Sequence, residues 1–298
     1  MPRHHYVPKF LLRGFADARE QLLVVSRTDL SRSYRAVAGR AAAEHGFYAI
    51  PSDELAAESR GDHNPEAIEA ALAEIESDAA IDVQNIRGGS FALDLDAHYR
   101  LVRLTALQLS RVPSFRRDYV EMANIAARKY LDLKISRERV REYLLRRGKA
   151  VDDRSVNEFY DEVRTSKFAL KPSKAHLTQA TIKIGIEAFM PDLFQRIPKI
   201  LRFAEPSLLT SDAGAGLWAP GHDNPRTVGI ANARAIFLPL DRFTALAFMR
   251  NGKPSDGVVQ RIWADHINTV VAGSAAERIY QHPDDSLLSR IDLPARKP

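Results

Sequence analysis

Two adjacent histidines, His4 and His5, open the chain beside an apolar run that ends at Arg13. Neighbouring side chains of an extended segment point in opposite directions, so one histidine can face a site while the other anchors the segment. Histidine titrates near neutral pH and also ligates metals. The pair therefore suits a general base or a metal ligand, and the alternative is a packed pair that anchors the N-terminus.

Two glutamates and an arginine supply complementary charges further along the chain. Glu69 and Glu76 are seven residues apart, close to two helical turns, so both fall near one face of a predicted helix. Gln108 and Arg111 share the largely apolar face of a second predicted helix. An arginine on such a face requires an anion, either Glu76, Asp212 or a bound phosphate or carboxylate. A structural salt bridge between the helices is the alternative.

A third polar group, Thr210-Ser211-Asp212, follows an apolar segment and precedes a flexible turn. Sites are often built from polar residues at such strand ends. Asp212 suits a general base, a metal ligand or an orienting partner for histidine, and the alternative is a turn in which it accepts backbone hydrogen bonds. His5 and Asp212 are the candidate ligands for a divalent metal ion, the one cofactor that we expect.

The composition limits the class of protein. The 298 residues hold no cysteine, which excludes disulfides, thiolate metal sites and cysteine nucleophiles. No apolar stretch reaches the roughly 18 residues of a membrane span, so we expect a cytoplasmic protein without a membrane partner. The net charge is +5, and residues 111–149 hold 12 Lys or Arg against 5 Asp or Glu. This basic stretch favours nucleic acid as a partner, and a solvated helical face is the alternative. The candidate nucleic-acid contacts are Arg137, Arg141, Arg146 and Arg147.

Periodicity and turn signals divide the chain into three parts. Strands are predicted at 21–26, 34–37, 47–50, 207–210, 227–230 and 235–238. Helices are predicted at about 64–87, 96–112, 114–131, 137–147, 155–165, 175–189, 190–203 and 257–279, with Ser136 as one cap. This order predicts an α+β, predominantly helical fold, with the N- and C-terminal strands in one small sheet. We expect a single domain over 1–298, with terminal strands at about 1–60 and 207–260 around a helical middle at about 64–203. A division near 206 is the alternative.

Several segments form a recognisable series. They are residues 4–15 (HHYVPKFLLRGF), Phe47-Tyr48, Glu69 with Ala73-Glu74-Ile75-Glu76, residues 108–113 (QLSRVP), Thr210-Ser211-Asp212, Phe237-Leu238-Pro239-Leu240 and Asn268. The series resembles a bacterial family called Domain of Unknown Function 4238. Ala213-Gly214 stand where that family usually has Asn-Pro, so the resemblance does not fix this turn. The likeness covers nearly the whole chain and implies a fold and candidate positions, without an established reaction.

These residue types predict a hydrolase, metal-assisted, that acts on nucleic acid or another phosphate-containing anionic substrate. The catalytic candidates are His4, His5, Glu76, Arg111 and Asp212, and the substrate-binding candidates are Arg13, Gln108, Thr210 and Ser211. Two other functions are open. One is a module that binds nucleic acid or an anion without catalysis, and the other is a structural protein whose polar cluster is a buried network.

Overall fold

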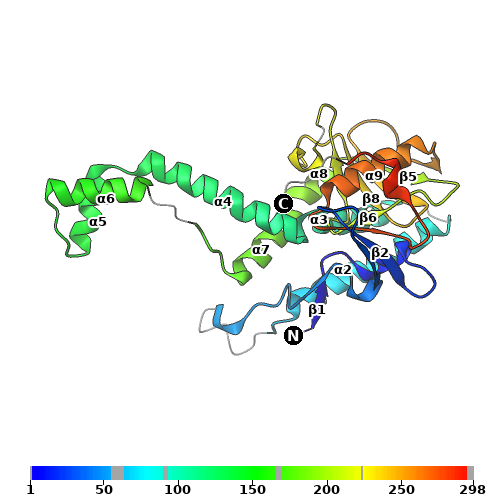
Figure 1. The fold of residues 1–298 in the computed structure, drawn as a ribbon, viewed down its shortest axis with the longest axis horizontal. Coiled ribbons are helices and arrows are strands. Elements are labelled where there is room, and N and C mark those ends of the chain that lie inside the picture. The colour runs from blue at the N-terminus through cyan, green and yellow to red at the C-terminus, as the bar shows by residue number, and fades with distance from the viewer. Residues whose placement is uncertain (1, 55–63, 90–92, 166–168, 223, 294–298) are drawn as a thin grey trace. The chain divides into compact units, whose positions relative to one another are not determined.

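In the computed structural model the chain separates into two compact units (Figure 1). We call residues 1–116 with 174–298 the main unit, and residues 117–173 the helical unit. The structure describes residues 2–54, 64–89, 93–165, 169–222 and 224–293. Residue 206, the alternative boundary of the sequence analysis, lies inside the main unit.

Nine α-helices lie in the described residues. They are α1 (Lys9–Leu12), α2 (Ala67–Arg87), α3 (Leu95–Arg111), α4 (Pro113–Lys134), α5 (Arg137–Arg146), α6 (Asp153–Thr165), α7 (Lys174–Ile184), α8 (Met190–Phe194) and α9 (Ile262–Ser274). A π-helical turn over Gly185–Phe189 joins α7 to α8. Pro113 separates α3 from α4 as predicted, and Ser136 caps α5 as predicted by accepting a hydrogen bond from the Arg139 amide.

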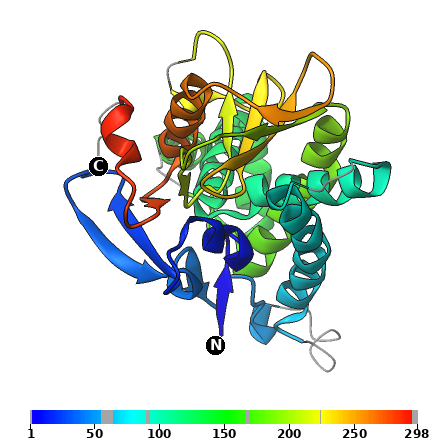
Figure 2. The ribbon, with the colours of Figure 1, turned by 90° about the vertical axis from the view of Figure 1, so that its right-hand side faces the viewer.

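The strands form three sheets within the described residues. The strands are β1 (Arg3–His5), β2 (Gln21–Ser26), β3 (Ser33–Val37), β4 (Ala43–His45), β5 (Ile197–Arg202), β6 (Thr210–Ser211), β7 (Gly216–Trp218), β8 (Ala235–Pro239), β9 (Thr244–Met249), β10 (Ser255–Val258) and β11 (Arg278–Gln281). The sheet orders are β1-β4, β3-β2-β11-β6 and β10-β5-β9-β8-β7. Figure 2 shows the C-terminal strand β11, in red, beside the N-terminal strand β2, in blue.

The fold is mixed α+β, with 49% of the described residues helical and 17% in strands, which form sheets of two, four and five strands. The expectation of a predominantly helical fold with one small sheet was therefore wrong. The five-stranded sheet was missed because its strands are short and come from residues 197–258, where pairing partners rather than local pattern decide the structure.

Individual segments show the same effect. Residues 190–203 were predicted as one helix, but α8 ends at Phe194 and β5 pairs with β9 over six residues. The C-terminal helix α9 ends at Ser274, and β11 occupies part of its predicted length. The segments 47–50 and 227–230 are not strands. By contrast, the strands predicted at 21–26, 34–37 and 235–238 are confirmed as β2, β3 and β8.

Helix α3 runs through the interior of the main unit. Eleven of its 17 residues are buried, whereas α2 buries mainly one stripe that includes Leu72, Ala79 and Val83. A helix enclosed in this way carries its polar side chains into the protein, so each of them needs a partner there. The fold thereby places Gln108 and Arg111 next to α2 and the N-terminal segment.

Candidate active site

Strand β1 sets the two histidines on opposite sides of a two-stranded sheet. His4 lies opposite Glu44 and His5 opposite Ala43 in the pairing with β4. His4 is fully buried, whereas His5 is half-buried. The alternation expected of an extended segment thus gives the two imidazoles different surroundings.

His4 has both ring nitrogens occupied. Its Nδ1 accepts a hydrogen bond from the Tyr48 amide at 2.9 Å, and its Nε2 lies 2.5 Å from Glu66 Oε2. The ring also stacks on the Tyr48 ring, with an angle of 9° between their planes. Because Nδ1 accepts, Nε2 is the donor to Glu66. His4 therefore fixes the N-terminal strand and has no free lone pair for a substrate.

His5 keeps one nitrogen free. Its buried Nε2 has no hydrogen-bond partner among the described residues. A neutral imidazole carries one lone pair on a ring nitrogen, so Nε2 can hold it. Burial lowers the pKa of His5, and the charges of Lys9 and Arg111 add to this, while Gly39 and Glu76 oppose it. The lowered pKa favours the neutral form of this imidazole at neutral pH.

Arg111 is a buried cation with a carboxylate partner. Its side chain is 1% exposed, and its Nη1 lies 2.5 Å from Glu76 Oε1. Its Nη2 donates to Gln108 Oε1 at 3.3 Å. Gln108 Nε2 in turn donates to the carbonyls of Tyr6 and Ala213, both at 3.1 Å. Gln108 therefore joins α3 to the N-terminal segment and the β6–β7 turn, and its polar atoms are used within the protein.

Glu69 is the residue of this region that the sequence analysis did not select as a site residue. Burial and the negative charges of Glu76 and Glu66 raise the pKa of Glu69 to about 7, while Arg111 lowers it. Glu76 and Arg111 act on the titration of both Glu69 and His5. We refer to His5, Glu69, Glu76 and Arg111 as the acid–base cluster. The seven-residue spacing from Glu76 was the sequence signal that could have identified Glu69.

Asp212 has a different environment. It is buried, and its carboxylate accepts hydrogen bonds from the amides of Ala276, Glu277 and Arg278, at 2.7, 2.6 and 3.0 Å. Burial raises the pKa of Asp212, and these three donors oppose that change. No hydrogen bond in the described structure links its carboxylate to the acid–base cluster. Asp212 therefore closes the turn that leads into β11, which corresponds to the structural alternative in the sequence analysis.

The neighbouring candidates Thr210 and Ser211 belong to the same corner. Both are buried in β6 and pair with β11, and Ser211 Oγ accepts a hydrogen bond from the Ala213 amide at 3.3 Å. Within the described residues, no group of three His, Asp or Glu side chains is arranged to hold a metal ion. His5 and Asp212, the predicted ligand pair, have separate sets of partners.

Arg13 lies at the surface of the main unit. Its side chain is 49% exposed and lies 2.6 Å from Glu20, which also lies 3.9 Å from the amine of Lys9. Lys9 influences the titration of His5, so this cation belongs to the surroundings of the acid–base cluster.

The four arginines predicted to contact nucleic acid lie in the helical unit. Arg137 donates to Asn157 at 2.6 Å, and Arg141 lies 2.5 Å from Asp153. Arg147 lies over the ring of Tyr143, and Arg146 is exposed at the end of α5. Two of the four therefore tie α5 to α6.

The family model described as "Protein of unknown function (DUF4238)" matches residues 3–285. The chain belongs to the DUF4238 family. No curated protein and no solved structure matches it. The family resemblance seen in the sequence is thereby confirmed.

In this DUF4238 chain, the acid–base cluster combines a neutral imidazole, a carboxyl group that holds its proton near neutral pH, and a buried guanidinium. Two titratable groups whose surroundings move their pKa values in opposite directions are typical of acid–base catalysis. The described helices include none that is long and apolar enough to cross a membrane.

Proposed function

We propose that this protein is a hydrolase that cleaves RNA by general acid–base catalysis at the acid–base cluster. The observation that carries the proposal is the Nε2 of His5, which has no partner among the described residues and lies in the field of Glu76 and Arg111, the same two charges that act on Glu69.

His5 acts as the general base. Its Nε2 takes the proton of the ribose 2′-hydroxyl as that oxygen attacks the adjacent phosphorus. RNA carries its own nucleophile, the 2′-hydroxyl, which DNA lacks. A site that offers a base, an acid and cations can therefore cleave RNA without binding a separate nucleophile. The new bond joins O2′ to phosphorus.

Glu69 acts as the general acid. With a pKa of about 7, its carboxyl group is largely protonated below neutral pH. It donates this proton to the 5′-oxygen as the bond from phosphorus to that oxygen breaks. The products are a 2′,3′-cyclic phosphate and a free 5′-hydroxyl, and hydrolysis of the cyclic phosphate uses the same two groups in reversed roles.

Arg111 and Lys9 supply positive charge. Arg111 is buried, where its field is weakly screened, and Lys9 is partly exposed and accessible to a phosphate. Arg13 adds a second exposed cation beside Lys9. Both surface cations are paired with Glu20, so a phosphate would compete with that carboxylate.

The experiment is a cleavage assay on labelled single-stranded RNA and DNA with and without a chelator. We expect RNA to be cleaved with the chelator present. His5→Gln and Glu69→Gln should each reduce the rate by about a hundredfold or more. His98→Gln is the matched control, because His98 also has a partnerless buried Nε2 and a pKa lowered by burial but packs against Phe194.

Glu74→Gln is the second control, since Glu74 is exposed on the same helix. The proposal is overturned if the protein cleaves neither nucleic acid, or if His5→Gln is as active as His98→Gln. Cleavage that requires an added metal ion would favour the metal-assisted hydrolase instead.

A further inference from the structure

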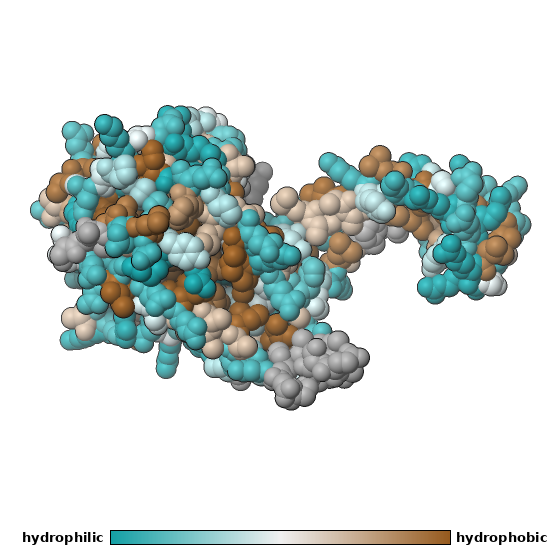
Figure 3. Space-filling view, turned by 180° about the vertical axis from the view of Figure 1, so that it is seen from behind, coloured by the Kyte–Doolittle hydropathy of each residue, from teal (hydrophilic) through white to brown (hydrophobic). Residues whose placement is uncertain are grey.

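The helical unit has a small hydrophobic core and several strongly exposed apolar side chains. Its buried cluster consists of Val140, Leu144 and Val156. Leu133 is 82% exposed and Leu145 65% exposed, and Figure 3 shows such apolar side chains, in brown, at the surface of this unit. Units of about 60 residues are close to the lower limit of independent stability. A partner that covers these side chains would supply the missing burial.

The exposed apolar side chains of α4 lie on one side of the helix. Met122, Ile125, Tyr130 and Leu133 are all more than half exposed. At about 100° per residue they fall within a sector of about 140°. This is the arrangement of a helix that packs against another element along one face.

An apolar groove with a basic rim lies beside this face. It has a volume of about 470 Å³ and is lined by residues of α4, α5 and α6, including Tyr130, Val140 and Phe159. The charged residues that line it are Lys134 and Arg139, with no acidic residue among the described lining. The groove therefore suits an apolar segment that carries negative charge.

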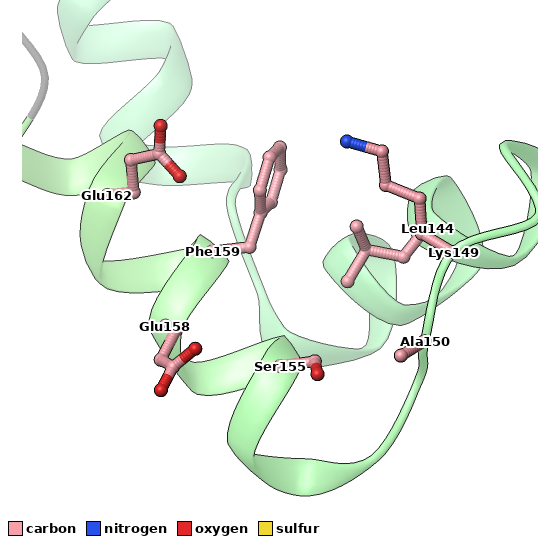
Figure 4. A pocket seen from close by; sticks show the side chains of 7 residues that line it. All are labelled: Leu144, Lys149, Ala150, Ser155, Glu158, Phe159 and Glu162. Carbon is pink, nitrogen blue, oxygen red and sulfur yellow. The ribbon is translucent and has the colours of Figure 1, made fainter.

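A second hollow is also lined by Phe159, and its charged lining residues are Glu158, Glu162 and Lys149. It has a volume of about 420 Å³ (Figure 4). The ring of Phe159 and the side chain of Leu144 stand between the carboxylates of Glu158 and Glu162 and the amine of Lys149. The same small unit thus offers a basic rim and an acidic rim next to exposed apolar side chains.

We infer that two copies of this chain pair through their helical units. The α4 side chains of each copy cover the groove of the other, and Lys134 and Arg139 of one copy face Glu158 and Glu162 of its partner. In this pairing Glu158 exchanges its contact with Arg154 for the partner's cations. A two-fold interface uses the same patch on both subunits, so the patch must be self-complementary. Both a basic and an acidic rim are present in one unit, so the patch meets this requirement. A patch with a basic rim alone would suit an acidic partner and not a second copy. The inference does not depend on the proposed function.

Sedimentation equilibrium of the full chain tests the pairing. We expect a concentration-dependent dimer for the wild type. Leu133→Glu should raise the dimer dissociation constant by at least about tenfold. The matched control is Leu95→Glu, because Leu95 is 71% exposed in the main unit and should leave the constant unchanged. Circular dichroism of both variants establishes that the helices are retained.

Salt provides an independent measurement. If the two rims face each other, added salt should weaken the dimer, and Lys134→Glu should weaken it at low salt. A wild type that stays monomeric over the whole concentration range overturns the inference. The inference is also overturned if Leu133→Glu and Leu95→Glu have the same dimer dissociation constant. A monomer that loses binding to single-stranded RNA in Leu133→Glu would assign the surface to nucleic acid instead.

Discussion

Glu69 and Glu76 lie two turns apart on one face of α2, where burial and the charge of Glu76 raise the pKa of Glu69 to about 7. Glu76 has the guanidinium of Arg111 as its partner, whereas no hydrogen bond to Glu69 is found in the described structure. A carboxyl group kept without a partner next to another carboxylate costs stability. Such a cost is typical of functional sites, where local preferences are violated for the sake of activity.

The first prediction concerns the stability of Glu69→Gln. The unfolded chain releases this proton near the ordinary pKa of 4.5 and the folded chain near 7, so folding binds the proton more tightly. The free energy of unfolding therefore falls as the pH rises from 4.5 to 7. Above pH 7 the substitution should raise it by about 1 to 2 kcal/mol, a value reduced for the partial exposure of Glu69. Denaturant unfolding at both ends of this range measures the effect.

Glu74→Gln, on the exposed side of α2, should show no such pH-dependent gain. A buried polar network with no other role predicts the opposite sign, because removing one of its members destabilises it. A loss of stability in Glu69→Gln above pH 7 would therefore support the structural interpretation.

The second prediction is the pH profile of RNA cleavage. His5 must be neutral to act as a base, and burial lowers its pKa, so the acidic limb should lie below the ordinary value of 6.5. Glu69 must be protonated to act as an acid, so the rate should fall as the pH rises through about 7. Values of kcat/KM measured across this range should give a bell. In Glu69→Gln the alkaline limb should be absent from the residual rate, and an unchanged limb would remove Glu69 from the reaction.

Local pattern predicted the helices better than the strands. The helical periods and the Ser136 cap depend on residues close in sequence, and α2, α5 and β2 form close to where they were predicted. Residues 197–202 became β5 because two other strands pair with them. Such pairing cannot be read from a short apolar segment, since the same residues also suit a helix.

Residue type predicted which side chains are buried polar groups, but not what they contact. Arg111 on an apolar face indicated a required anion, and Glu76 is that anion. The environment of Asp212 depends on three amides near residue 277, more than sixty positions away. Glu69 differs from Glu74 through burial and neighbouring charge, which a single sequence does not display.

The third prediction separates a buried ion pair from an exposed one. Glu76→Ala leaves the guanidinium of Arg111, 1% exposed, without its carboxylate and should cost about 3 kcal/mol of unfolding free energy. Glu187→Ala breaks the exposed pair with Lys183 and should cost about 0.5 kcal/mol or less. Combining Arg111→Met with Glu76→Leu should recover most of the loss. Equal costs for the two alanine variants would show that the Arg111 pair is screened by water.

The last prediction tests the junction at Gln108. Gly214 has a φ of +70°, and a Cβ there would lie 2.5 Å from Gln108 Nε2. Gly221 has a similar φ of +75°, but a Cβ at that position would have no atom within 4 Å, so it serves as the matched control. Both alanine variants place a Cβ at a positive φ, which costs about 1 to 2 kcal/mol.

Gly214→Ala must in addition displace the amide of Gln108 from the carbonyls of Tyr6 and Ala213. We expect it to lose about 1 to 3 kcal/mol more than Gly221→Ala in denaturant unfolding. The side-chain amide resonances of Gln108 should shift in Gly214→Ala and stay in place in Gly221→Ala. If both variants lose the same unfolding free energy and the Gln108 resonances do not shift, the turn after Asp212 adapts to the added Cβ. The hydrogen bonds of Gln108 would then not be needed to fix the N-terminal segment to this turn.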